Sequence, residues 1–446
     1  MTLLKAGSAA VDITPEDSQF LFGYPHVERY STGVNNPLFS SSLYLENGNN
    51  NMMFIANDII FVDKELSRRV RKRISEETGV PEEGIMVTAT HTHSGPITVD
   101  YLSNISDPIV PEADSGYLKL LENGIVESGI QAFRNSRPAR IAMAVADGEG
   151  IGTNRRDPSG PADPQVPVLL LKEADSEDFI ACMLVYSMHP TVLHEDSTLI
   201  SGDFPSFTRE YLQRELLGEN CPVLYHTGPE GNQSPRHVTS SNTFSEAARL
   251  GGMLGKRVES AVRGQEYSTR ADLAWTREFI TPSIKRMPSL SDAEIHLKKA
   301  VEKLDLLRNN GSSRQDVRTA ECDWFGAEET VTLAKAAESG IVKKYADSCL
   351  PAEVQLMKIG EWYFAGWPGE VFIEFSLEAK EKHENLFIIN LANGEFQGYI
   401  VTPEAEEEGG YEASNAMFGS ETGKMLIAAT EKALEKPDMK KKGVSV

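Results

Sequence analysis

Two histidines, His91 and His93, stand one residue apart in the segment ATHTHSGP, directly after the apolar run 84–89. Alternate residues of an extended strand point to the same side, so the two imidazoles would share a face with Cα atoms ~6.5 Å apart. That spacing suits two metal ligands, or one ligand beside a catalytic imidazole. It also suits two polar residues at a strand end that bond only to the backbone.

A third histidine, His189, ends the apolar run in ACMLVYSMHPTVL. The following Pro190 forces the chain out of regular strand pairing, so His189 is also expected at a strand end. A structural and a functional role are both open for it. His194 precedes two acidic residues, and we expect it to be a solvated loop residue.

Ser234 lies in the segment VLYHTGPEGNQSPRH, after glycines at 228 and 231 that permit tight backbone turns. Such a loop can expose N–H groups to an anion, and Ser234 could then be a nucleophile or a hydrogen-bond donor to a substrate. A simple Ser-Pro turn is the alternative. The motif GxSxG is absent from the sequence, so the usual hydrolase elbow is not supported.

An acidic residue and two tyrosines complete the candidates near the carboxyl end. Glu370, in EWYFAGWPGEVF, is predicted where a strand passes into a helix that begins near this residue. A carboxylate at that junction could bind a metal or simply complement the helix dipole. Tyr399 and Tyr411 stand in glycine-rich surroundings, where aromatic packing is the alternative role.

Alternating strand and helix patterns predict the elements that position these residues. Strands are expected at 8–13, 42–46, 52–60, 84–89, 139–145, 166–171, 180–187, 222–226, 353–359 and 362–365. Helices are expected at 63–79, 205–218 and 243–264. The pattern indicates an α/β fold with mixed central β-sheets flanked by helices. Because no Pro/Gly/Ser-rich linker interrupts the chain, we expect one large catalytic domain, 1–446, with a helical hairpin inserted at 290–340 and a flexible tail at 437–446.

Composition excludes several classes of function. The 446 residues carry 66 acidic and 44 basic side chains, a formal charge of -22, which disfavours nucleic acid and anionic lipid surfaces as partners. The sequence has no continuous apolar run of about 18 residues and no signal-peptide pattern at its start. We therefore expect a cytoplasmic protein without stable membrane association. The four cysteines form no CxxC pair, which favours reduced, mostly buried thiols.

Taken together, the motifs resemble the neutral/alkaline non-lysosomal ceramidase family, whose members hydrolyse an N-acyl amide with zinc. The resemblance spans nearly the whole chain, in the order and approximate spacing of the family. It rests on AGSAAVDITP, THTHSGP, MHP, GNQSP, PGE, and GYIVTPE followed by GYEAS.

Each role that these motifs carry in the family falls here on the expected residue type. The resemblance implies three zinc ligands, His91, His189 and Glu370, with Tyr399 near or on the metal, His93 beside the ligands or in contact with an oxyanion, and Ser234 as the active-site serine. Three protein ligands leave room for a water whose pKa zinc lowers from about 16 toward 7, so that hydroxide exists at neutral pH. Zinc, His93 and the Ser234 region could stabilise the oxyanion that its attack produces.

Two departures from the family affect the expected substrate. Known members are exported and carry a further carboxyl-terminal β-domain, whereas neither feature is evident here. In addition, ITVDY at 97–101 replaces a glycine-rich stretch, and Gly-Asn replaces Gly-Asp ahead of Ser234. We therefore expect an altered pocket and a soluble small-molecule N-acyl substrate rather than bilayer ceramide, with acyl length and oligomeric state left open.

Three alternatives to the zinc mechanism remain at this stage. Ser234 could attack directly with His93 as its base. The protein could be a serine esterase or amidase that uses no metal. It could also be a non-catalytic relative that binds a sugar or a lipid.

Overall fold

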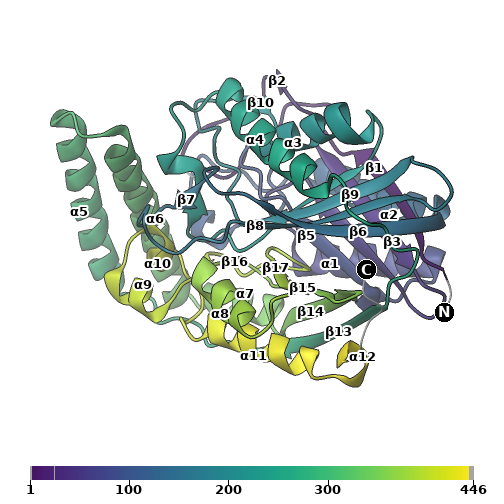
Figure 1. Ribbon diagram of the computed structural model, residues 1–446. Helices are drawn as coiled ribbons and strands as arrows, with labels where there is room; N and C mark the ends of the chain where they lie inside the picture. The colour runs from purple at the N-terminus through teal and green to yellow at the C-terminus, as the bar shows by residue number, and fades with distance from the viewer. Residues whose placement is uncertain (1–2, 25, 441–446) are drawn as a thin grey trace.

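The computed structural model describes residues 3–24 and 26–440, in which two β-sheets pack face to face between outer layers of helices (Figure 1). This arrangement confirms the α/β class with mixed sheets flanked by helices. Within the described residues, no helix combines the length and the apolar character needed to cross a membrane.

The larger sheet has eight strands, and the sequence predicts all of them. Across the sheet they are β11 (Val223–Thr227), β9 (Phe179–Tyr186), β8 (Gln165–Glu173), β6 (Arg137–Asp147), β1 (Lys5–Asp12), β3 (Phe39–Glu46), β4 (Asn51–Asn57) and β5 (Ile85–Ala89). The outermost pairs, β11 with β9 and β4 with β5, are parallel, and the pairs between them are antiparallel.

The smaller sheet has four strands in the order β13 (Leu273–Ile280), β14 (Ala352–Ile359), β15 (Trp362–Gly366) and β17 (Leu386–Ile389). The sequence analysis misses β13. This strand lies at an edge, and its residues Arg277 and Glu278 form ion pairs with Glu83 and Lys432. An edge strand with a charged outer face lacks the apolar run of a buried strand.

Strand alternation divides the core into an inter-sheet layer and a helix-facing layer. On β4, Met52, Phe54 and Ala56 pack between the two sheets, whereas Met53 and Ile55 pack toward the helices. Both faces are therefore buried, which explains why the strand is apolar throughout.

Three helix pairs cover the outer faces. They are α1 (Lys64–Thr78) with α2 (Ser115–Arg134), α3 (Asp203–Leu212) with α4 (Phe244–Val262), and α8 (Ile373–Glu381) with α11 (Thr422–Leu434). Side-chain caps begin several of these helices, as when Asp63 accepts a hydrogen bond from the Leu66 N–H at the start of α1. The sequence analysis misses α2, whose interior glycines lower its intrinsic helix propensity.

Short elements connect these layers around the strand ends. They are β2 (Gly33–Val34), β7 (Thr153–Asn154), β10 (Leu199–Ile200), β12 (Gln233–Ser234), β16 (Glu370–Val371), β18 (Tyr399–Ile400), α9 (Pro403–Glu408), α10 (Tyr411–Ser414), the 3-10 turns η1 (Glu82–Gly84), η2 (Leu102–Asn104) and η4 (Pro235–His237), and the π-helical turn η3 (Gln213–Leu217).

Two consecutive helices occupy the predicted insertion, 290–340, and a third follows it. α5 (Leu290–Asn309) and α6 (Arg314–Glu338) form a hairpin that projects at the left of Figure 1, and α7 (Ile341–Cys349) follows it. The inner helix, α6, packs on η2 and α10. The hairpin is therefore attached at the end of the molecule where α10 lies.

The predicted flexible tail begins too early. Residues Pro437–Lys440 form a final helical turn, α12, in which Met439 is fully buried. The carbonyl of Met439 accepts hydrogen bonds from Lys358 Nζ and Tyr363 OH, both at 3.0 Å. Because the segment is mostly polar, its composition did not indicate that Met439 would be buried. Residues 441–446 of the predicted tail lie outside the described residues.

α4 contains two adjacent glycines, Gly251 and Gly252, and its contact with α3 requires glycine only at the first. A Cβ at Gly251 would lie 2.5 Å from the Phe204 carbonyl oxygen, whereas a Cβ at Gly252 meets nothing closer than 3.9 Å. Gly251→Ala should therefore lower the free energy of unfolding by about 1–3 kcal/mol through overpacking. Gly252→Ala should raise it by up to about 1 kcal/mol through helix propensity. Urea unfolding of both variants tests this, and equal effects would contradict it.

Candidate metal centre and active site

Four side chains from three strand ends converge beyond the carboxyl ends of β5, β9 and β15. Nε2 of His91 lies 3.2 Å from Nε2 of His93, and Glu370 Oε2 lies 3.3 Å from His91 Nε2 and 3.0 Å from His189 Nε2. His91, His189 and Glu370 are buried, and His93 is half-buried. The sequence-predicted candidates thus occupy one small region.

His91 reaches this region through an unusual backbone conformation. A continuing strand would carry His91 and His93 as alternate residues, as the spacing predicts, but β5 ends at Ala89 and His91 has φ +67°. Residues other than glycine rarely adopt this left-handed conformation, and it tends to occur at functional sites. The His91 N–H donates to the Ile59 carbonyl at 2.9 Å, which holds the backbone in place.

Each of the three imidazoles is oriented by a backbone carbonyl at Nδ1. The acceptors, at 2.7 to 3.0 Å, are the oxygens of Ile60 for His91, Gly23 for His93, and Glu230 and Gln233 for His189. A carbonyl oxygen can only accept, so Nδ1 carries the hydrogen and Nε2 presents a lone pair when the ring is neutral. Gly23 has φ +113°, and a Cβ there would lie 2.5 Å from His93 Nδ1, so only glycine permits this contact.

The resulting donor set fits a divalent cation. Nε2 lone pairs that face each other across 3.2 Å repel unless a cation or a proton lies between them. Ligand atoms of His91, His93 and His189 all lie within 4.8 Å of one another, and so do those of His91, Glu230 and Glu370. Imidazole nitrogen and carboxylate oxygen are the ligands that catalytic zinc sites use. Backbone carbonyls that fix the distal ring nitrogens are also usual around such sites.

The environment favours the protonation states that metal binding needs. Burial alone would raise the pKa of the Glu370 carboxyl, but His91 and His189 hold it well below its usual range. Burial lowers the pKa of His93 well below its ordinary value, and it lowers that of His189 to about 4. At neutral pH the site therefore offers a carboxylate at Glu370 and neutral imidazoles at His93 and His189 without prior loss of protons.

Glu370 and Tyr399 are neighbours because two short strands pair. Glu370 lies in β16 rather than at a helix start, since α8 begins only at Ile373. β16 pairs in parallel with β18, in a register that places Glu370 opposite Tyr399. The Tyr399 ring lies 6.4 Å from that of His189. Burial raises the pKa of Tyr399 well above its usual range, so the phenol keeps its proton.

Ser234 lies on a wall of the same region. It belongs to β12, which pairs with β7, and its Oγ accepts the Arg236 N–H at 3.3 Å as the cap of η4. Ser234 lines one cavity together with His93, Tyr399 and Tyr411. The structure therefore brings all six sequence-predicted site residues together.

The comparisons with known proteins agree with this arrangement. Residues 4–220 match a family model described as neutral/alkaline non-lysosomal ceramidase, N-terminal. Over these residues the chain is similar to this ceramidase family. A neutral ceramidase of Mycobacterium tuberculosis is 24% identical over 236 residues, covering 48% of this chain and 37% of that protein. One of Pseudomonas aeruginosa is 21% identical over 284 residues, covering 58% of this chain and 42% of that protein.

The fold of almost the whole chain is similar to that of solved ceramidase structures. The crystal structure of the P. aeruginosa neutral ceramidase superposes with a TM-score of 0.72 at 18% identity, covering 96% of this chain and 73% of that chain. A structure of a ceramidase complexed with C2 gives 0.74 at 17% identity. In sequence, this ceramidase homologue spans less than half the length of the two curated relatives it matches.

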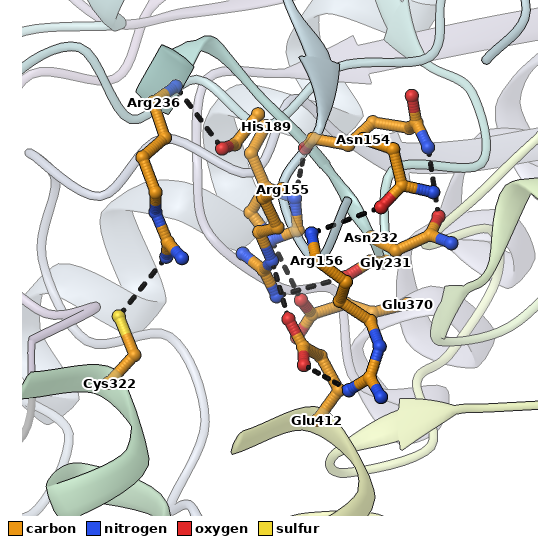
Figure 2. A network of polar contacts seen from close by, with 12 residues as sticks. Asn154, Arg155, Arg156, His189, Gly231, Asn232, Arg236, Cys322, Glu370 and Glu412 are labelled. Atoms are coloured by element: carbon orange, nitrogen blue, oxygen red, sulfur yellow. Dashed lines mark hydrogen bonds and ion pairs between the residues drawn. The ribbon is translucent and has the colours of Figure 1, made fainter. Parts of the chain in front are cut away.

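An ion-pair network holds the site segments of this ceramidase homologue together (Figure 2). Arg155 donates to Glu412 at 2.7 Å and to the Gly231 carbonyl at 2.9 Å, and Arg156 donates to Glu412 at 3.0 Å. The Arg155 guanidinium also lies 5.2 Å from the centre of the Tyr399 ring. These contacts link β7, the loop before Ser234, and α10.

The sequence analysis misses one face of α6 that borders the site. The residues on it recur at helical spacing, at positions 318, 322, 325 and 329, and are Arg318, Cys322, Phe325 and Glu329. Burial raises the pKa of the Glu329 carboxyl to about 8. The spacing alone could have suggested a shared face, but only the packing of α6 on η2 and α10 shows that this face borders the site.

Two further residues differ from expectation. Glu230 is fully buried, and its Oε1 has no hydrogen-bond partner among the described residues. Its position between Gly228 and Gly231 in the sequence was the signal that could have identified it as a site residue. His194 is half-buried rather than solvated, with its ring 6.0 Å from that of Tyr24.

Cavities adjoin the candidate metal centre. A small central cavity of about 30 Å³ includes His91, His93 and Glu370 in its lining. An apolar cavity of about 410 Å³ shares Phe22 and Tyr101 with it. Ile97, Val99 and Tyr101 of the replaced segment 97–101 line the apolar cavity, where the sequence analysis expects an altered pocket.

Removing a ligand side chain should empty the centre. His91→Ala and His189→Ala should each lose stoichiometric zinc, because too few strong donors then remain at neutral pH. Glu370→Gln should weaken zinc less completely, since an amide oxygen remains a poor ligand. Metal analysis after dialysis against zinc measures this, with His383→Ala as a control outside the site. One zinc per chain in either His91→Ala or His189→Ala would contradict the assignment.

Proposed function

We propose that this chain is a zinc-dependent hydrolase that cleaves the amide bond of an N-acyl substrate. The observation that carries the proposal is the convergence of three carbonyl-fixed Nε2 atoms and the Glu370 carboxylate in a buried site that shares lining residues with an apolar cavity. The similarity of residues 4–220 to the ceramidase family model supports the reaction class. Held by His91, His189 and Glu370, zinc supplies a Lewis acid and a bound water of lowered pKa.

The chain's own residues supply donors and orientation around the amide carbonyl. Tyr399 keeps its phenolic proton at neutral pH and can donate it in a hydrogen bond to a developing oxyanion. The hydroxyl of Ser234 faces the same cavity and can donate similarly. His93, fixed at Nδ1 by Gly23, offers Nε2 as the atom that receives and returns a proton. Burial of these groups limits the access of bulk water.

A metal-free serine mechanism has less support. A serine nucleophile needs its hydroxyl hydrogen-bonded to a base. Ser234 Oγ instead accepts the Arg236 N–H, and Nε2 of His93 faces His91 at 3.2 Å. The completeness of the donor set likewise argues against a non-catalytic relative.

The charge of the chain favours a dissolved substrate. At -22 the protein is repelled by anionic bilayer surfaces, so we propose that it takes soluble N-acyl compounds in preference to bilayer ceramide. The cytoplasmic location inferred from the sequence stays a prediction.

A substrate panel tests this function. Zinc-loaded protein should hydrolyse soluble N-octanoylethanolamine and N-octanoylglucosamine with a higher kcat/KM than long-chain ceramide in phosphatidylcholine vesicles. Chelation should abolish turnover, and zinc should restore it. Product amines are measured by mass spectrometry. Turnover that survives chelation would contradict the metal, absence of any amide turnover would contradict the reaction, and a preference for vesicle ceramide would contradict the substrate.

The role of Ser234 is tested separately. If Ser234 donates one hydrogen bond to the oxyanion, Ser234→Ala should lower kcat by about 10²- to 10³-fold and keep a measurable rate. A nucleophile would leave essentially none. Rapid-quench mass spectrometry of the wild type should find no acyl adduct, and an adduct on Ser234 would overturn this role.

A further inference from the structure

A basic cavity of about 50 Å³ opens beside the metal centre. His93 and Ser234 line it, and so do three arginines, Arg155, Arg236 and Arg318. Among the described residues, no aspartate or glutamate lines this cavity. The chain has a net charge of -22, so the positive lining of this cavity is opposite in sign to the charge of the protein as a whole.

Two of these arginines already have carboxylate partners. Arg155 pairs with Glu412 at 2.7 Å. Arg318 pairs with Glu195 at 2.8 Å and with Glu321 at 3.1 Å. Their charges are therefore largely balanced by the protein itself.

Arg236 has no such partner. Its guanidinium donates to the Thr319 hydroxyl at 3.3 Å and to Cys322 Sγ at 3.2 Å, both neutral acceptors (Figure 2 shows the second). No described carboxylate lies within ion-pair distance, 4.0 Å, of it. A half-buried guanidinium with no described carboxylate in ion-pair contact retains the capacity to bind a carboxylate in two-point geometry.

The field in the cavity disfavours cations. His194 lines the same wall, and its pKa is lowered to about 2 by burial, with Arg318, Arg314 and Arg236 adding to the effect. A ligand group that enters here would meet positive charge.

The basic cavity and the apolar cavity flank the central one. The basic cavity shares His93 and Tyr399 with the centre, and the apolar cavity shares Phe22 and Tyr101 with it. An amide carbonyl at the centre would thus have one substituent in apolar surroundings and the other beside Arg236.

We propose that the substrate is an N-acyl amino acid, whose acyl chain occupies the apolar cavity and whose free carboxylate binds Arg236. This rests on the proposed function and narrows its substrate class. In the reaction water adds to the acyl carbon, the C–N bond breaks, and the amine nitrogen takes a proton. The products are a fatty acid and a free amino acid.

The test compares N-octanoylglycine with N-octanoylethanolamine, in which a hydroxyl replaces the carboxylate. Zinc-loaded wild type should prefer the glycine compound in kcat/KM by about tenfold or more, as expected for a charge-assisted bidentate contact. Arg236→Gln should lose this preference through a higher KM for the glycine compound alone. Arg236→Lys, which retains the charge, should keep part of it. Arg214→Gln, an exposed change of equal charge, should keep all of it.

A binding measurement separates this inference from the proposed function. Titration calorimetry of metal-free protein should show tighter binding of N-octanoylglycine than of N-octanoylethanolamine in the wild type, and equal binding in Arg236→Gln. If both amides are hydrolysed but the neutral one is preferred or equal, the amino-acid proposal is overturned and the hydrolase stands. If neither amide is hydrolysed, the proposed hydrolase activity is contradicted. The difference in calorimetric affinity between the two compounds then decides by itself whether Arg236 binds a carboxylate.

Discussion

The structure depends on one constraint, the placement of several lone pairs that repel one another in a buried space. Hydrogen bonds from Nδ1 to backbone carbonyls fix the three imidazoles, so their Nε2 atoms must face each other and the Glu370 carboxylate. Burying such a set costs free energy unless a cation or protons balance it. The acceptor carbonyls come from widely separated parts of the chain, so the centre exists only when the sandwich is assembled.

Much of the surrounding architecture serves to hold those parts in register. The parallel pairing of β16 with β18 sets Glu370 beside Tyr399. The buried pair of Arg155 and Glu412 ties β7 to α10. A buried ion pair is weak evidence for added stability, because desolvation offsets much of the attraction. The ion pair instead fixes the position of Arg155, which also donates a hydrogen bond to the Gly231 carbonyl and lies over the Tyr399 ring.

The helical hairpin contributes charged side chains to the cavities of the site. Its inner helix presents Arg318 to the basic cavity and Glu329 to the central one. Its residues Thr319 and Cys322 also orient Arg236 without neutralising it. The cavity beside the candidate metal centre is therefore positive because the acidic side chains of the protein lie elsewhere or are paired.

The sequence by itself determined the strands of the larger sheet and the residue types at their ends. Apolar runs that stop at His-Pro or Pro-Gly are local signals, and local signals predicted the strands of the larger sheet and the histidines and acid that follow them. Tertiary structure decided the rest. The positive φ of His91, the register that joins Glu370 to Tyr399, the burial of Met439 and the inward face of α6 depend on contacts between distant segments. Local sequence patterns do not say which distant segments meet, because each of these contacts is decided by the free energy of the packed whole.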